Sequence, residues 1–331
     1  MTSDRSTRAV VIRSRVRFAR NIVDYPFPPV LDTQGRNEII EKVDAALNRH
    51  GYTKLEEINT PLGAKALSER NLISREFAGE KEARALFANA DRSVCIMVCE
   101  EDHLRIQGFA DGFDLEKAFN AAKEAEQILG GAIRFAFDKE LGYLTHCPTN
   151  LGTAMRASVM LFLPGLTMAN RMGDVKSELD KIGMTIRGIY GEGSKASAYM
   201  YQISNRLSLG ICESDILQKT EHIIKQIAEE ERKARAAVFE AAKTKITDKV
   251  RRSLGILKYA YAISAEEFLS VYADVRLGID LGLVDEVDCT KLDRLLPAMM
   301  PANLISENQA ACSTPASRDV YRAKRIREAL A

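Results

Sequence analysis

The sequence predicts an α+β fold, in which a largely antiparallel sheet flanked by helices is followed by an all-helical C-terminal domain. Up to residue 212, the 331-residue chain alternates short strand-like runs with segments of helical periodicity. The link at 138–142 between two strand-like runs is too short for a parallel crossover, so we expect its neighbours to pair as a hairpin. From Glu213 onward the pattern is helical and no convincing strand follows.

The strand predictions rest on runs of β-branched and apolar residues, some of which alternate with polar residues. In chain order these runs are 9–18, 93–100, 104–110, 133–138, 143–147, 157–163, 184–190 and 198–210. Between them, the segments 115–130 and 168–183 repeat apolar residues at helical spacing, and each ends at a glycine. A sheet with helices packed on it is the expected arrangement.

The C-terminal part is predicted to be a separate helical domain. We place the boundary after residue 235, which divides the chain into 1–235 and 236–331. The sequence SAEE at 264–267 reads as a capping box that opens a helix. The core-facing residues of that helix would be Phe268, Leu269, Tyr272 and Val275. The segment 306–317 is expected to be a flexible linker.

The composition excludes several classes of function. Lys and Arg total 47 against 46 Asp and Glu, so the formal net charge of +1 gives no reason to expect nucleic acid or an anionic membrane as a partner. No stretch approaches the roughly 20 apolar residues of a membrane span. The six cysteines show no zinc-site spacing, which favours free thiols in a reducing compartment. We therefore expect a cytoplasmic protein with no metal site of its own.

The first candidate site is an arginine-rich strand near the N-terminus. In RSRVRFAR, Arg15 and Arg17 lie on one face if the segment is extended. Taken alone, the pattern is typical of a solvated edge strand whose charges oppose aggregation. Two guanidinium groups on one face would also form a clamp for phosphate oxygens, to which arginine is better suited than lysine.

Two later segments add acidic residues, a thiol and further arginines. CEEDHLRIQG places Glu101 among adjacent carboxylates and Arg105 shortly after them, although an acidic hairpin turn would have the same composition. CPTNLGTAMRAS places Cys147 and Arg156 on either side of a tight turn. In an arbitrary sequence such a cysteine is a small buried apolar residue.

The glycine-rich segment RGIYGEGSKAS contributes Arg187 and Glu192. It is close to a P-loop, but Ser194 interrupts the GxxxxGK[ST] spacing. Together the four segments supply five arginines, a carboxylate in each of two loops, and one thiol. Phosphoryl transfer depends mainly on positioning and charge neutralisation, so a ring of arginines around a nucleotide would serve it without a P-loop. The carboxylates indicate a cationic acceptor.

In this order, the four segments resemble the motifs of the phosphagen (ATP:guanido) kinase family of creatine and arginine kinases. Each family motif occurs in this sequence with at most one change: the Arg-x-Arg strand, EEDHLRI, CPTNxGTxxRAS and RGxxGE. The resemblance is closest to the bacterial branch that phosphorylates arginine in proteins. Three features favour that branch: the chain begins almost at the Arg-x-Arg strand, without the N-terminal helical domain of the small-molecule kinases; its glycine loop reads YGEGS; and 255–282 resembles that branch's C-terminal domain.

The resemblance implies an ATP-dependent, Mg²⁺-requiring kinase that phosphorylates arginine side chains in proteins. The residues implied to hold the ATP phosphates are Arg15, Arg17, Arg105, Arg156 and Arg187. Glu101 and Glu192 would clamp the acceptor guanidinium, with Glu101 as the base that takes its proton. Cys147 would lie beside the guanidinium, where thiolate charge steers the reacting nitrogen. We expect Mg²⁺ to be held by phosphates and water and assign no protein ligand to it.

The C-terminal segment SRDVYRAKR matches an RDxxRA pattern of the same branch. By itself it would be an ordinary charged helix. In the context of the family it implies an allosteric phosphoarginine site, formed by Arg318, Asp319, Arg322 and Ala323. The helical domain would also serve homodimerisation and substrate docking. The implied partners are proteins with exposed arginine, an activator protein and Clp-type protease machinery, in stress response and protein quality control.

Two alternatives remain open at this stage. A kinase for free arginine is disfavoured by the missing N-terminal domain, and a non-catalytic phosphoarginine-binding adaptor is disfavoured because no implied catalytic residue has been lost. Three positions depart from the family pattern: Cys99 where asparagine is usual, Asn71 where histidine is expected near the nucleotide, and Met160 where small-molecule kinases have an adenine-packing histidine. These departures bear on nucleotide affinity.

Overall fold

The computed structural model describes residues 10–189 and 198–330. Its strands are β1 (Val11–Arg20), β2 (Tyr52–Lys54), β3 (Ala85–Asn89), β4 (Val94–Val98), β5 (Leu104–Asp111), β6 (Phe137–Asp138), β7 (Gly142–Tyr143), β8 (Met155–Phe162), β9 (Met184–Gly188) and β10 (Met200–Asn205). Its α-helices are α2 (Thr33–Leu47), α3 (Pro61–Glu69), α4 (Arg75–Gly79), α5 (Leu115–Ala132), α6 (Pro164–Met168), α7 (Met172–Lys181), α8 (Glu213–Ala241), α9 (Lys243–Tyr259), α10 (Ala265–Asp280), α11 (Cys289–Ala298), α12 (Pro301–Glu307) and α13 (Pro315–Leu330). Short 3₁₀ turns are η1 (Pro28–Val30), η2 (Glu56–Asn59) and η3 (Pro148–Asn150).

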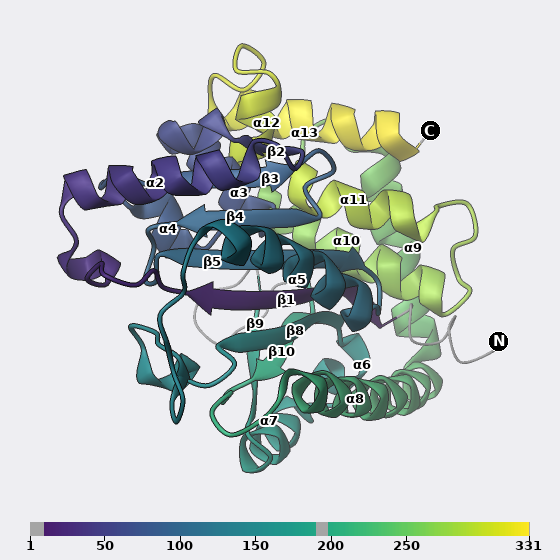
Figure 1. Cartoon of the computed structure of the whole chain (residues 1–331). Coiled ribbons are helices and arrows are strands. Elements are labelled where there is room, and N and C mark those ends of the chain that lie inside the picture. The colour runs from purple at the N-terminus through teal and green to yellow at the C-terminus, as the bar shows by residue number, and fades with distance from the viewer. Residues whose placement is uncertain (1–9, 190–197, 331) are drawn as a thin grey trace.

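Eight of the described strands form one sheet in the order β2-β3-β4-β5-β1-β8-β10-β9. Every described pairing in it is antiparallel, which confirms the predicted fold class. The arginine-rich strand β1 is not an edge strand, because it pairs with β5 on one side and β8 on the other (Figure 1). The interpretation of its charges as protection of an exposed edge is therefore wrong.

The two faces of the sheet differ in chemistry, and β1 shows the difference residue by residue. Val16 and Phe18 are fully buried in an apolar layer that the sheet shares with α2, α5 and α8, and the ring of Phe18 packs edge-on against Phe119 of α5. Arg15 and Arg17 alternate with them and therefore project from the opposite face. The core thus fixes which way the arginines point.

The predicted hairpin around 138–142 is present, but it is smaller than expected and lies outside the main sheet. Its strands β6 and β7 have two residues each and form their own sheet, with Asp138 Oδ1 accepting from Glu140 N and Leu141 N at the turn. Most of 133–138 and 143–147 is not strand. Each central strand of the main sheet already has a partner on both sides, so this segment pairs with its neighbours only through isolated bridges, from Ile22 to Phe135 and from Gly142 to Gly152 among the described residues.

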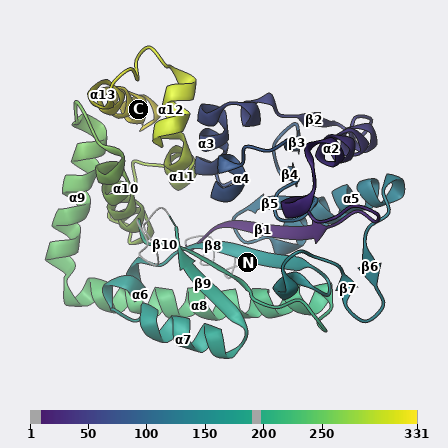
Figure 2. The ribbon, with the colours of Figure 1, turned by 90° about the vertical axis from the view of Figure 1, so that its left-hand side faces the viewer.

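The helices from α9 to α13 gather around a second apolar core (Figure 2). Ser264 caps α10 by accepting from Glu267 N at 3.1 Å, and Phe268, Tyr272 and Val275 are fully buried, as the sequence predicts. The predicted linker at 306–317 is shorter than expected, because α12 extends to Glu307 and α13 begins at Pro315. The boundary proposed after residue 235 falls within α8. None of the described helices has the length and apolar content to cross a membrane.

A buried carboxylate joins α8 to the end of the sheet. Glu231 is fully buried and accepts from Gly165 N at 2.8 Å, Leu166 N at 2.9 Å and Arg235 Nε at 3.0 Å. Arg235 in turn donates to Asp280 Oδ2 of α10 at 2.8 Å. This network ties the first turn of α6, which follows β8, to the helical part of the molecule.

Replacing Glu231 with alanine is expected to lower the free energy of unfolding by about 3 kcal/mol, because it leaves the Nε–H group of Arg235 and two backbone N–H groups buried without their acceptor. Urea denaturation of the intact protein measures the change. Glu230→Ala is the matched control, since that neighbouring carboxylate is exposed and its ion pairs contribute little. Equal losses in the two variants would contradict the assignment of Glu231 as a structural anchor.

Candidate active site

Six arginines project from the same face of the main sheet, which we call the arginine face. They are Arg13, Arg15 and Arg17 of β1, Arg105 of β5, Arg156 of β8 and Arg187 of β9. The strand register brings them together: Arg17 lies opposite Arg156, and Arg105 lies opposite Ala19, two residues further along β1. All five arginines predicted from the sequence therefore belong to one surface.

The structure adds Arg13 to the predicted set. Its guanidinium carbon lies 4.1 Å from the centre of the Phe109 ring on the neighbouring strand β5. The alternation of arginine at every second position of RSRVR could have identified Arg13, because residues two apart in a strand share a face. The Arg-x-Arg motif by itself predicts only Arg15 and Arg17.

The arginine face concentrates positive charge in a partly buried place. Burial, reinforced by Arg13, Arg105 and Arg156, lowers the pKa of Arg15 to about 10. Burial and the same kind of repulsion hold the pKa of Arg17 well below its ordinary value. The pKa of Arg156 is also lowered, first by burial and then by Arg187 and Arg105. An anion with several negative charges would relieve this repulsion.

Two of the predicted acceptor-site groups act on the same guanidinium. The lowered pKa of Arg156 is partly restored by Glu101 and Cys147, so both groups lie within electrostatic reach of it. Glu101 Oε2 accepts from Arg105 Nη2 at 3.0 Å, and its other oxygen lies 4.0 Å from His146 Nδ1. Glu101 is 38% exposed, so it can meet a ligand at the edge of the arginine face.

The neighbouring Glu100 has a different environment. Its side chain is only 9% exposed, pairs with Arg105 and accepts from the hydroxyl of Ser74. Glu100 therefore serves to hold Arg105, while Glu101 remains accessible. Among the three adjacent carboxylates of the sequence, accessibility singles out Glu101 as the one that can receive a substrate.

The third carboxylate, Asp102, joins the acidic loop to the loop that carries Cys147. It is fully buried and its Oδ1 accepts from Asn21 Nδ2 at 2.7 Å and from His146 N at 2.8 Å. Asn21 Oδ1 also accepts from His103 N at 2.9 Å. These contacts fix the loop of Glu101 relative to the loop of Cys147, and no motif in the sequence predicts this role for Asp102 or Asn21.

The Cys147 loop is shaped by a glycine and anchored by a serine. Cys147 precedes η3, and its Sγ lies 3.0 Å from the hydroxyl of Thr149. Gly152 has φ +95°, and a Cβ there would lie 2.4 Å from the Ser208 carbonyl oxygen. The Ser208 hydroxyl donates to the Leu151 carbonyl at 2.8 Å. The glycine of CPTNLGT is therefore required by this close approach.

Of the three positions that depart from the family pattern, Asn71 and Met160 lie beside the arginine face, whereas the Cys99 side chain belongs to the apolar core on the opposite face of the sheet. Cys99 has φ +63° and is fully buried at the start of the acidic loop, and asparagine is the residue that adopts this conformation more readily. Asn71 and Met160 line a small cavity of about 20 Å³ with Arg13, Arg15, Phe109, Ser158 and Gln202. They therefore adjoin the predicted phosphate-binding arginines. Glu192, the predicted second clamp, lies outside the described residues.

The predicted phosphoarginine motif lies on α13, away from the arginine face. Arg322 is fully buried and donates to the Met299 carbonyl at 2.8 Å, to the Ile263 carbonyl at 2.7 Å and to Asp319 Oδ1 at 2.5 Å. Ala323 is buried in the second apolar core. Within the described part of the chain, no hydrogen-bond partner is found for Arg318 Nε or for one terminal nitrogen of Arg322.

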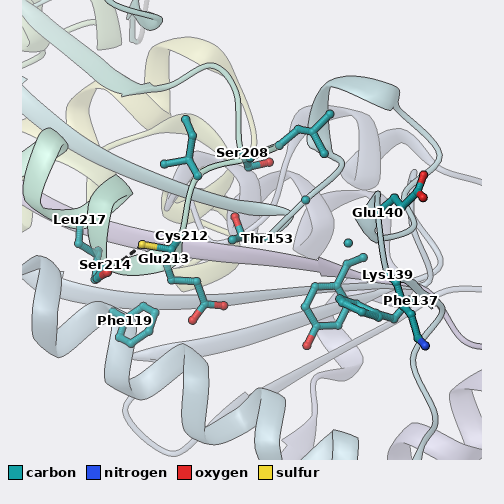
Figure 3. A pocket seen from close by; sticks show the side chains of 16 residues that line it. Phe119, Phe137, Lys139, Glu140, Thr153, Ser208, Cys212, Glu213, Ser214 and Leu217 are labelled. Carbon is teal, nitrogen blue, oxygen red and sulfur yellow. Dashed lines mark hydrogen bonds between the residues drawn. The ribbon is translucent and has the colours of Figure 1, made fainter.

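A cavity of about 720 Å³ lies elsewhere, between the β6–β7 hairpin, α5 and the segment that leads into α8 (Figure 3). Phe119, Phe137, Tyr143 and Leu217 give it apolar walls, and no arginine is among its described lining residues. Its described charged lining residues are Lys139, Glu140 and Glu213, so it lacks the concentration of positive charge found on the arginine face. No group of three or more His, Cys, Asp or Glu residues in the described ranges is arranged to hold a metal ion.

Two protein-family models together match most of the chain. Residues 34–234 match the model described as ATP:guanido phosphotransferase, C-terminal catalytic domain, and residues 243–331 match the protein-arginine kinase McsB C-terminal domain. A protein-arginine kinase from Caldanaerobacter subterraneus subsp. tengcongensis is 40% identical over 324 residues, covering 96% of each chain. Another from Symbiobacterium thermophilum is 40% identical over 330 residues, covering 97% of this chain and 93% of that protein.

Solved structures with a similar fold include a lombricine kinase and a taurocyamine kinase. The crystal structure of lombricine kinase aligns with a TM-score of 0.59 at 25% identity, covering 69% of this chain and 68% of that one. The substrate-free duplicated taurocyamine kinase from Schistosoma mansoni aligns with a TM-score of 0.60 at 25% identity, covering 81% of this chain and 40% of that one.

Proposed function

The chain belongs to the protein-arginine kinase branch of the ATP:guanido phosphotransferases, and on this basis we propose that it transfers the γ-phosphoryl group of ATP to arginine side chains of proteins. The observation that best supports this proposal is the accessible carboxylate of Glu101, which pairs with Arg105 at 3.0 Å at the edge of the arginine face. A polyanionic donor would bind the arginines, and a cationic acceptor would bind next to it at the carboxylate.

The chemical step follows from these positions. The bond from the γ-phosphorus to the bridging oxygen breaks, and a phosphorus–nitrogen bond forms with the acceptor guanidinium. A charged guanidinium is no nucleophile, so its nitrogen must lose a proton as that bond forms, and Glu101 is the proposed acceptor of the proton. The five predicted arginines would hold the phosphates in line and stabilise the charge of the transferring group. Mg²⁺ would accompany ATP and neutralise its phosphates.

Two further groups complete the proposed acceptor site. Glu192 is proposed as the second carboxylate that orients the guanidinium. The Cys147 thiol, as a thiolate, would attract the same cation from the other side of the turn. Neither group needs to form a covalent intermediate, because the phosphoryl group passes directly from ATP to nitrogen.

The choice of acceptor is tested by offering Mg-ATP together with an arginine-rich protein such as casein and, in parallel, free L-arginine. The proposal expects acid-labile phosphate on the protein and little on the free amino acid. Transfer to free arginine alone would instead identify a small-molecule kinase. Binding of phosphoarginine without transfer to either acceptor would identify an adaptor.

The helical part of the chain is proposed to regulate this activity. We assign residues 1–235 to a catalytic domain and 236–331 to a domain for homodimerisation, substrate docking and phosphoarginine sensing. The proposed biological setting is cytoplasmic stress response and protein quality control, with an activator protein and Clp-type proteases as partners. The unpartnered nitrogens of Arg318 and Arg322 in the described structure support an anion site at α13.

Arg318→Ala is expected to weaken phosphoarginine binding at α13 by about tenfold to hundredfold, because a charge-assisted contact is lost. Arg318 is preferred to Arg322, whose guanidinium supports the fold through two backbone carbonyls. Isothermal titration of the intact protein with phosphoarginine measures the change. Lys324→Ala, an exposed change on the same helix, is the control, and equal titrations for both variants would reject the site.

A further inference from the structure

The segment from Glu69 to Ser74 connects the helical part of the molecule to the arginine face. At its start, both carboxylate oxygens of Glu69 accept from Ala302 N, at 2.9 and 3.2 Å, and one of them accepts from the Asn303 side chain at 3.1 Å. Arg70 Nε donates to Asn303 Oδ1 at 2.5 Å. Asn303 is 3% exposed, so α12 holds this end of the segment in a buried place.

The rest of the segment touches the arginine face at three points. Asn71 lines the small cavity next to Arg13 and Arg15. The Leu72 carbonyl accepts from Gln107 Nε2 at 2.9 Å, and Gln107 lies opposite Arg17. Ser74 donates to Glu100, the carboxylate that holds Arg105 beside Glu101. One short segment therefore borders both the phosphate end and the acceptor end of the proposed site.

The same helix α12 is held from its other side by α13. Arg322 donates to the Met299 carbonyl, two residues before α12 begins. At the far end of α12, Glu307 pairs with Arg325 at 2.7 Å and accepts from the Tyr321 hydroxyl at 3.3 Å. Helix α12 therefore connects α13 to the 69–74 segment, because it contacts α13 on one side and α3 with this segment on the other (Figure 2).

We propose that Glu69 and Asn303 are positioning residues for phosphoryl transfer. By fixing the 69–74 segment against α12, they set the placement of Asn71 and of the Ser74–Glu100–Arg105 contact on the arginine face. The helical domain would then be a structural part of the active site, not only an attached regulatory module. The inference rests on the proposed function for its catalytic consequence, while the mechanical link itself does not depend on it.

Asn303→Ala removes the side-chain contacts to Arg70, to Glu69 and to the Ala66 carbonyl without touching the arginine face, while the backbone N–H groups of 302–303 can still donate to Glu69. We expect kcat/KM for Mg-ATP to fall about tenfold, because buried hydrogen bonds to charged groups are lost and the segment shifts. Glu69→Gln is expected to act in the same direction. The double variant should lose no more than about the larger single effect, since both residues hold one clamp.

The controls are exposed residues on the same two helices, Lys65→Gln on α3 and Ser306→Ala on α12. Kinetics and Mg-ATP affinity are measured well below the unfolding temperature of each variant, and hydrogen exchange is followed at 69–74 and at β4. The expected result is faster exchange at 69–74 only, together with weaker Mg-ATP binding. A lower unfolding temperature with unchanged affinity, kinetics and exchange would show that the contacts only stabilise the fold and would overturn the proposal.

A failure of the proposed function would look different. If the unaltered protein phosphorylated no arginine, the Mg-ATP affinity and the exchange at 69–74 would still decide whether Asn303 positions the segment. Weaker Mg-ATP binding and faster exchange in Asn303→Ala would then support the positioning role alone. Unchanged values in both measurements would overturn it.

Discussion

Glu101→Gln is expected to lower kcat for arginine phosphorylation by about 10²- to 10⁴-fold, the range typical of losing a general base. The amide is almost isosteric with the carboxylate, but it cannot take a proton from the guanidinium or attract its charge. Glu101 is part of a loop fixed by Asp102 and His103, so the substitution should leave the loop in place. Initial rates with Mg-ATP and casein measure the loss.

Glu76→Gln is the matched control, because this glutamate is exposed on α4 and lies outside the proposed site. The control should retain the rate of the unaltered enzyme. Glu101→Gln should also bind Mg-ATP normally, since the arginines that hold phosphate remain. Retention of more than about a tenth of the rate in Glu101→Gln would assign the base to another group.

Arg156→Met is expected to lower kcat/KM for Mg-ATP by about 10³-fold and, at the same time, to raise the unfolding temperature of the ligand-free protein. Burial and the neighbouring Arg187 and Arg105 lower the pKa of Arg156, which means that folding disfavours its charged form. Replacing the cation with an apolar side chain of similar length removes that cost. The functional and stability effects should therefore have opposite signs.

Thermal unfolding and steady-state kinetics on the same preparation separate the two effects. Arg206→Met serves as the control for removing an arginine close to the same sheet, because Arg206 is exposed and directly follows β10. A fall in both activity and unfolding temperature for Arg156→Met would mean that Arg156 supports the fold. That outcome would contradict its assignment to the phosphate site.

The sequence predicted the parts of the fold that depend on local patterns. Alternation in β1 separates Val16 and Phe18 from Arg15 and Arg17, and SAEE marks the start of α10, because both patterns are set by neighbours in the chain. Between β1 and β4 the sequence patterns predict no element. The helix caps of this region at Asp32, Thr60 and Ser74 were visible in the sequence, but the three-residue strand β2 gains its conformation only by pairing with β3.

Only the site residues that belong to short sequence motifs could be predicted from the sequence. The arginines and Glu101 occur in short recognisable segments, so their roles could be expected before their positions were known. The supporting contacts could not be expected, because they join distant parts of the chain. Asn21 contacts Asp102 across 81 positions, and Arg70 contacts Asn303 across 233. The size of the β6–β7 hairpin was mispredicted for the same reason, since the free edges of the sheet are a tertiary property.

The most direct test of the central claim is the identity of the bond that is formed. A peptide with ¹⁵N-labelled arginine guanidino groups is incubated with the protein and Mg-ATP, and the product is examined by ³¹P NMR. The account predicts a new phosphorus resonance that is split by ¹⁵N and lost on acid treatment. An acid-stable resonance without ¹⁵N splitting, from phosphate on a serine, threonine or tyrosine hydroxyl, would contradict it.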